Sequence, residues 1–136
     1  MGLPAYVGLA LATFIVALGV MPHSERATAL HLMLAVGALP LMFAAMSHFI
    51  PVLTRRRAAP PQLGYLPVLA LVGGGLVVAA LGLPALRWAQ HVGALLVATT
   101  AAGLLGWSRH RRASMLGRAH AGLAWYEAAL TCLIAA

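Results

Sequence analysis

The chain has 136 residues, of which 62% are hydrophobic and 8% are charged, and its formal net charge is +7. Soluble domains carry roughly 25% charged residues, so the composition excludes a water-soluble globule, and it excludes a disordered chain because such chains are poor in apolar residues. The charges are nine arginines and two glutamates, with no Lys, Asp or Asn. We therefore expect a single hydrophobic domain, residues 1–136, buried mainly in lipid.

Five apolar runs are long enough to cross the hydrocarbon core of a bilayer, which takes about 20 helical residues. We interpret the first as a retained helix, since no basic region precedes it and a good cleavage site is lacking. The break at Pro84 is so short that the third and fourth runs should form a tight antiparallel hairpin. The five runs are 3–21, 29–53, 63–84, 86–107 and 117–136.

These runs predict an all-α fold, a polytopic membrane bundle of five helices. The fifth run contains Glu127 and has no polar flank at its end, so four spans plus an interfacial helix are the alternative.

Small residues at 73–75 fall inside the third run, where they let helix backbones approach closely. The single Cys132 excludes a disulfide framework.

The distribution of arginines predicts the orientation. The loops 54–62 and 108–118 hold seven arginines, whereas the opposite side holds Arg26 and Arg87. Cytoplasmic loops carry the excess of basic residues, so we place the N-terminus in the cytoplasm and, with five spans, the C-terminus outside. The same placement explains the positive charge without nucleic-acid binding, and we expect a multi-pass protein of the bacterial inner membrane.

Six histidines are the feature that needs an explanation in a chain so poor in polar groups. We expect His23 and His110 to lie in solvated loops. The other four fall within or at the ends of the predicted spans, where ionisable groups are costly and usually face a partner or a cofactor.

Depth along the helices sorts these four into two pairs. At a rise of 1.5 Å per residue, His31 and His91 share the outer half of the membrane, and His48 and His120 share the inner side. His31 and His48 are about 25 Å apart along one helix and cannot ligate one metal. Paired imidazoles are what haem b needs between helices, and copper is a second candidate. The alternative is that each ring caps a helix end or donates to a backbone carbonyl.

Glu127 lies about 10 Å further along the fifth run than His120, near the bilayer midplane. A lone carboxylate at that depth should be protonated or paired, and a proton relay is its functional interpretation. In the alternative, the last segment does not cross the bilayer and Glu127 is exposed to water. We expect the methionines of the second span, Met33, Met42 and Met46, to serve core packing rather than copper binding.

No catalytic residues are predicted. A Ser-His-Asp set is excluded because the chain has no Asp, and a phosphate loop of the G-x-x-x-x-G-K type is excluded because it has no Lys.

Three segments, His31-Leu-Met-Leu-Ala-Val-Gly37, Met46-Ser-His-Phe-Ile-Pro51-Val-Leu-Thr54-Arg and Pro60-Pro-Gln-Leu-Gly-Tyr-Leu-Pro67, carry a family resemblance. About 40 residues resemble the NnrS family of bacterial membrane proteins and small proteins similar to subunit I of haem-copper oxidases. In both, a His near the start of a span precedes a small-residue helix and then Pro and Thr in a basic loop. Ala29 and Leu32 stand where the family usually has a second His and an acidic residue.

The resemblance implies a membrane protein that contains haem, alone or together with copper, and acts in nitric oxide or respiratory metabolism. It carries over His31 as the main metal ligand and His48 as the second. Our leading prediction is therefore haem b bound through paired histidines, for electron transfer or for handling a diatomic gas such as NO. Other membrane subunits or a second copy are the expected partners beside the lipid bilayer.

Two other functions compete with this prediction. The first is a non-redox small subunit or assembly factor of a respiratory complex, in which the histidines are structural. The second is half of a metal or proton transporter that uses Glu127 and the histidines after dimerisation.

Overall fold

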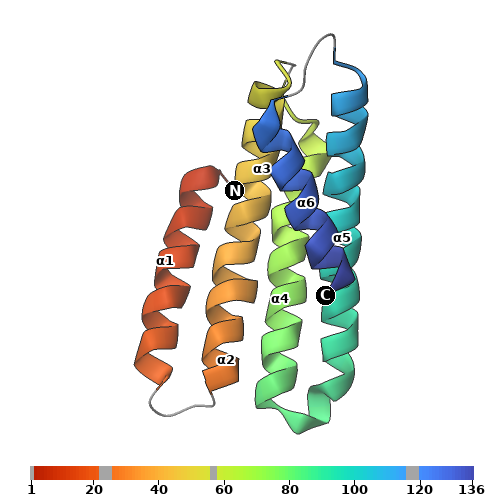
Figure 1. The fold of residues 1–136 in the computed structure, drawn as a ribbon. Helices are drawn as coiled ribbons and strands as arrows, with labels where there is room; N and C mark the ends of the chain where they lie inside the picture. The colour runs from red at the N-terminus through yellow and green to blue at the C-terminus, as the bar shows by residue number, and fades with distance from the viewer. Residues whose placement is uncertain (1, 22–25, 56–57, 116–119) are drawn as a thin grey trace.

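The computed structural model describes residues 2–21, 26–55, 58–115 and 120–136, and these ranges contain helices and turns but no strand. Figure 1 shows long helices running alternately up and down, with a shorter one lying across them. The all-α prediction is confirmed. The elements are α1 (Leu3–Val20), α2 (Arg26–His31), η1 (Leu32–Ala38), α3 (Leu39–Leu53), η2 (Pro61–Tyr65), α4 (Leu66–Gly82), η3 (Pro84–Leu86), α5 (Arg87–Ala113) and α6 (Ala121–Ala135).

Four continuous helical stretches are long and apolar enough to cross a membrane: Leu3–Val20, Arg26–Leu53, Pro61–Gly82 and Pro84–Ala113. They match the first four predicted spans. The fourth ends at Ala113 rather than at residue 107, because the arginines beyond Trp107 are good helix formers and nothing in that run breaks the helix. His110, predicted in a loop, therefore lies in the last turn of α5.

The fifth predicted span is a shorter helix. α6 has 15 residues, about 22 Å of helix against the roughly 30 Å of a hydrocarbon core. It packs mainly on α5 and also contacts α3. Residues 117–119 of the predicted span lie outside the described ranges. In Figure 1, α6 starts beside the end of α5 and reaches only part of the way down the bundle.

The second long stretch is not a uniform α-helix. Residues Leu32–Ala38 form a π-helix, η1, between α2 and α3. Pro40 follows at the start of α3, where its ring has no N–H to donate and would clash with the carbonyl four residues earlier in an α-helix. The wider π turns accommodate this proline. Such segments are rare and occur frequently at functional sites.

Two adjacent glycines draw α4 against both of its neighbours. A Cβ at Gly73 would lie 2.9 Å from the carbonyl oxygen of Gly93 in α5, and a Cβ at Gly74 would overlap the carbonyl of Ala35 in η1. Backbones can meet this closely only where a helix carries small residues. α4 therefore lies between η1 and α5, and the close helix approach predicted from residues 73–75 is confirmed at two of the three.

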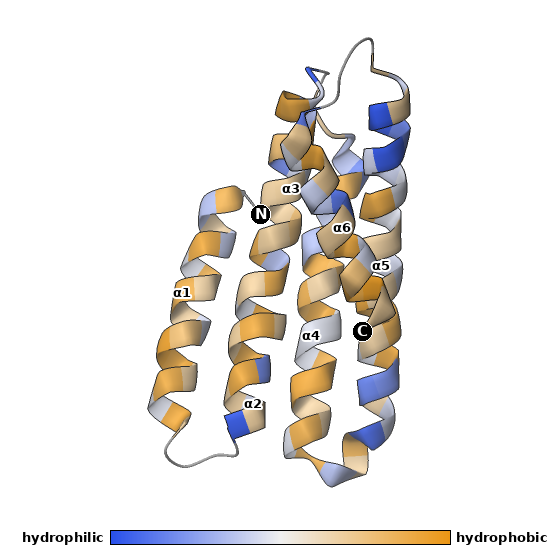
Figure 2. Cartoon of the chain, in the orientation of Figure 1, coloured by the Kyte–Doolittle hydropathy of each residue, from blue (hydrophilic) through white to orange (hydrophobic). Residues whose placement is uncertain are grey.

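The outside of the bundle is apolar, as lipid contact requires. Leu11, Ile15, Leu95 and Trp125 are 62 to 76% exposed. Figure 2 shows hydrophobic residues over the length of the helices and hydrophilic ones gathered near their ends. The main buried cluster joins α3, α4, α5 and α6 at the α6 end of the bundle, and it includes Phe43, Ile50, Leu104 and Leu123.

Candidate functional site

A groove with a cavity volume of about 950 Å³ runs along one face of the bundle. Its floor comes from α4, its two walls come from the η1–α3 stretch and from α5, and the last turns of α6 line one end. Apolar side chains line it almost throughout, and the exceptions are His31 and Cys132. Leu34, Met42 and Leu95 line the walls and are 59, 44 and 66% exposed. The groove therefore opens sideways, where lipid would lie.

His31 is the polar side chain of the η1 wall, at the junction of α2 with the π-helix. Its Nδ1 lies 2.8 Å from the carbonyl oxygen of Ala27. A carbonyl only accepts, so Nδ1 carries the proton, and the neutral ring keeps its lone pair on Nε2. Histidines that bind metals are commonly held in this way, with one nitrogen donating to a carbonyl and the other free to ligate.

His91 lies on the face of α5 that forms one groove wall further along the helix, although His91 is not itself one of the lining residues. It is exposed and precedes Ala94, Leu95 and Ala98 by three, four and seven residues, and these three line the groove. Residues at such spacings share one face of a helix. Within the described part of the chain, the His91 ring has no hydrogen-bond partner.

The two rings of the outer pair lie at similar depths on the two walls. Ala35 and Gly93 meet neighbouring positions of α4, so they mark a common level. His31 precedes Ala35 by four residues, and His91 precedes Gly93 by two. Both helices run in the same direction, so both rings lie on the same side of that level. At 1.5 Å per residue their heights differ by about 3 Å.

The inner pair is arranged differently. His120 is the N-cap of α6, and its Nδ1 accepts the N–H of Gly122 at 3.0 Å. In the neutral ring the proton then sits on Nε2, which leaves no lone pair for a metal. His48 is exposed, and its ring meets Phe49 edge-on with centroids 5.2 Å apart.

The structure also does not align the inner pair in depth. The α3 residue nearest Gly122 is Leu53, which lies five residues beyond His48, or about 7 Å along the helix. The interpretation that a ring caps a helix or donates to a carbonyl therefore describes His120 and His31. Only His31 combines that role with a free ring nitrogen in the groove.

The methionines of the second span and His23 are the remaining candidates from the sequence. Met33 and Met46 are buried in the two hydrophobic clusters, as the core-packing prediction expects, while Met42 is exposed on the groove wall. His23 lies outside the described residues. Among the residues that are described, no group of three or more His, Cys, Asp or Glu side chains gathers in a metal-binding arrangement.

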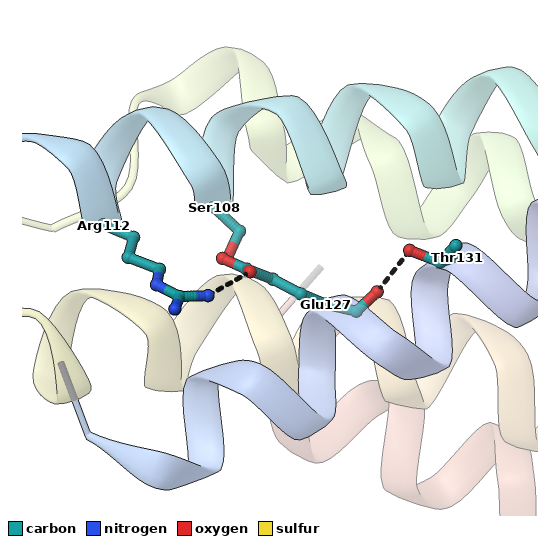
Figure 3. Close-up of polar contacts among 4 residues, drawn as sticks. All are labelled: Ser108, Arg112, Glu127 and Thr131. Carbon is teal, nitrogen blue, oxygen red and sulfur yellow. Dashed lines mark hydrogen bonds and ion pairs between the residues drawn. The ribbon is translucent and has the colours of Figure 1, made fainter.

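Glu127 is buried at 8% exposure between α6 and α5, and it is paired. Arg112 Nη1 lies 2.8 Å from Oε2, and the hydroxyl of Ser108 donates to Oε1 at 3.2 Å. Figure 3 shows both side chains reaching from α5 to the carboxylate, while Thr131 donates to the backbone carbonyl of Glu127. Glu127 therefore lies level with the charged end of α5, and its two partners on that helix are not predictable from the sequence.

No protein-family model, no curated protein and no solved structure matches the chain.

Proposed function

We propose that this chain binds haem b in the groove, where His31 and His91 would hold its iron. The observation that carries the proposal is the hydrogen bond from His31 Nδ1 to Ala27, because it leaves a ligating lone pair on a ring that lines a large apolar groove. We choose His91 as the partner because it lies at a similar depth, on the α5 face that forms the opposite wall. His120 is left out because its Nδ1 lone pair accepts the N–H of Gly122 at the helix cap. His48, its predicted partner, is left out with it.

The groove suits a tetrapyrrole in size and in chemistry. Its volume of about 950 Å³ lies near the upper end of the range for small-molecule sites. The lining offers apolar side chains, including Phe43, and almost no polar competitor for the ring nitrogen. Haem held by two imidazoles supplies one-electron transfer, and an open axial position permits binding of a gas such as NO. The chain's own contribution is to hold the ligand rings and to keep water from the macrocycle.

The resemblance to the NnrS family supports a role in nitric oxide or respiratory metabolism, and it keeps copper as an alternative metal at His31. For the location we propose the bacterial inner membrane, with the N-terminus in the cytoplasm. Arg111 donates to the carbonyl of Ala58 at 3.4 Å, which joins the two arginine-rich connections at one end of the bundle. By the positive-inside rule that end is cytoplasmic.

The test is an absorption spectrum of the full chain purified in detergent and titrated with haemin. We expect a Soret band and sharp reduced α and β bands, lost in His31→Ala, weakened in His91→Ala and unchanged in His110→Ala, which alters an exposed histidine at the far end of α5. A folded protein that stays colourless through the titration contradicts the proposal and favours the non-redox subunit. Binding of Cu⁺ but not of haemin, abolished by His31→Ala, favours the copper site.

A further inference from the structure

Arg87 lies on the same face of α5 as one groove wall, about two helical turns before Ala94, the first α5 residue that lines the groove. It is the first residue of α5, and it precedes His91 by four residues. At that spacing the two side chains share one helix face, which continues through Ala94, Leu95 and Ala98 into the groove wall. Arg87 therefore lies one turn beyond His91, on the outer side of the groove lining.

The charge of the Arg87 guanidinium is not neutralised by a partner in the described residues. Arg87 is exposed, and no hydrogen bond or ion pair joins it to another residue in the ranges that the structure describes. A guanidinium matches a carboxylate with two parallel N–H donors.

Arg26 provides a matched comparison. It begins α2 at the same end of the bundle and precedes His31 by five residues. Five residues correspond to about 140° of helix rotation beyond one full turn, so Arg26 and His31 do not share a face. The two arginines have the same charge and a similar depth, but only Arg87 is aligned with a candidate ligand.

We propose that Arg87 binds a propionate carboxylate of the haem and so fixes which edge of the macrocycle faces the outer surface. This inference rests on the proposed function. An apolar groove accepts the macrocycle but has no group for its two carboxylates, which remain charged and need water or a cation. Arg87 is placed to supply that cation from the α5 wall.

The test compares haemin with its dimethyl ester, which has the same macrocycle but no carboxylates. Each is titrated into the wild-type chain and into Arg87→Gln, Arg87→Lys and Arg26→Gln, and dissociation constants are read from the Soret band. We expect Arg87→Gln to weaken haemin binding about tenfold, as the loss of one charge-assisted hydrogen-bonded pair implies. Arg87→Lys should recover part of the loss, and Arg26→Gln should bind as the wild type does. All four proteins should bind the dimethyl ester equally.

Two results overturn the inference. In the first, Arg87→Gln binds haemin as tightly as the wild type. In the second, Arg87→Gln weakens binding of the dimethyl ester by the same factor as binding of haemin. That result assigns the effect to the groove and not to the carboxylate. Failure of the wild type to bind either compound overturns the proposed function itself, so the two claims fail separately.

Discussion

Arg112 Nη1 lies 2.8 Å from Glu127 Oε2, and this ion pair joins the last turns of α5 to α6. The two ends of the pair differ in environment, because the Glu127 side chain is 10% exposed and that of Arg112 is 49% exposed. Removing Arg112 and removing Glu127 should therefore lower the stability by different amounts. A buried carboxylate without its cation is costly, whereas an arginine without its carboxylate can turn to water.

We predict that Arg112→Gln destabilises the chain by roughly 2 kcal/mol, and that Glu127→Gln costs less, about 1 kcal/mol. The double variant should be more stable than Arg112→Gln alone, because it leaves no buried charge unpaired. Thermal unfolding in detergent, followed by circular dichroism, measures the three values. Equal and additive losses would show that the pair contributes no net coupling.

The same Glu127→Gln variant separates a structural pair from a proton relay. If the pair only docks α6, liposomes containing the variant and the wild type should show the same passive proton or metal uptake. Uptake that is present in the wild type and absent in Glu127→Gln would instead favour the transporter alternative.

The glycines of α4 allow a matched pair of substitutions. Gly74→Ala should cost about 1 to 3 kcal/mol, because its new Cβ overlaps the backbone of Ala35 and forces α4 away from η1. Gly75→Ala, where a Cβ would meet nothing within 4 Å, should be neutral or stabilise the helix by up to about 1 kcal/mol. Unfolding temperatures of the two variants check the prediction, and similar losses at both positions would contradict it.

Hydropathy and helix breakers were enough to predict the bundle. Four of the runs are the four long helical stretches, and Pro84 gives the turn that closes the α4–α5 hairpin. The predicted end of the fourth span is wrong, because runs of charged residues are typical of loops but arginines also continue a helix readily. The sequence analysis also does not predict the π-helix η1. It depends on how Pro40 is accommodated, and the apolar stretch around it has the pattern of an ordinary α-helix.

The candidate site could be predicted only in part. Rise per residue is enough to predict that His31 and His91 lie at a similar depth, since depth follows from spacing along straight helices. That the two rings bind one group stays a prediction. The same argument paired His48 with His120 and could not reveal that His120 caps α6. Which nitrogen of a ring is free depends on hydrogen bonds over a few ångströms, and spacing along the chain does not encode them. The partners of Glu127 were hidden for the same reason, because they lie on another helix.

The N-cap that His120 forms on α6 gives a prediction that distinguishes this residue from the proposed haem ligands. His120→Ala should loosen the start of α6 by about 1 kcal/mol, and His120→Asn, whose side-chain oxygen can accept the same N–H, should retain most of the stability. Neither substitution should change the Soret band of the haemin complex. Hydrogen exchange at the first turn of α6 measures the first effect. Loss of the Soret band in His120→Asn would instead restore the inner pair as ligands.

Cys132 reports on occupation of the groove. It is exposed and lines the end formed by α6, so haem in the groove should slow its alkylation by a maleimide several-fold, as mass spectrometry of timed samples can measure. The control places a cysteine at Leu11, a position of α1 that is 62% exposed and outside the groove lining, in a Cys132→Ser background. Haemin should not slow alkylation there. Equal protection at both positions would mean that haemin coats the apolar surface without entering the groove, because a bound macrocycle shields only the residues that surround it.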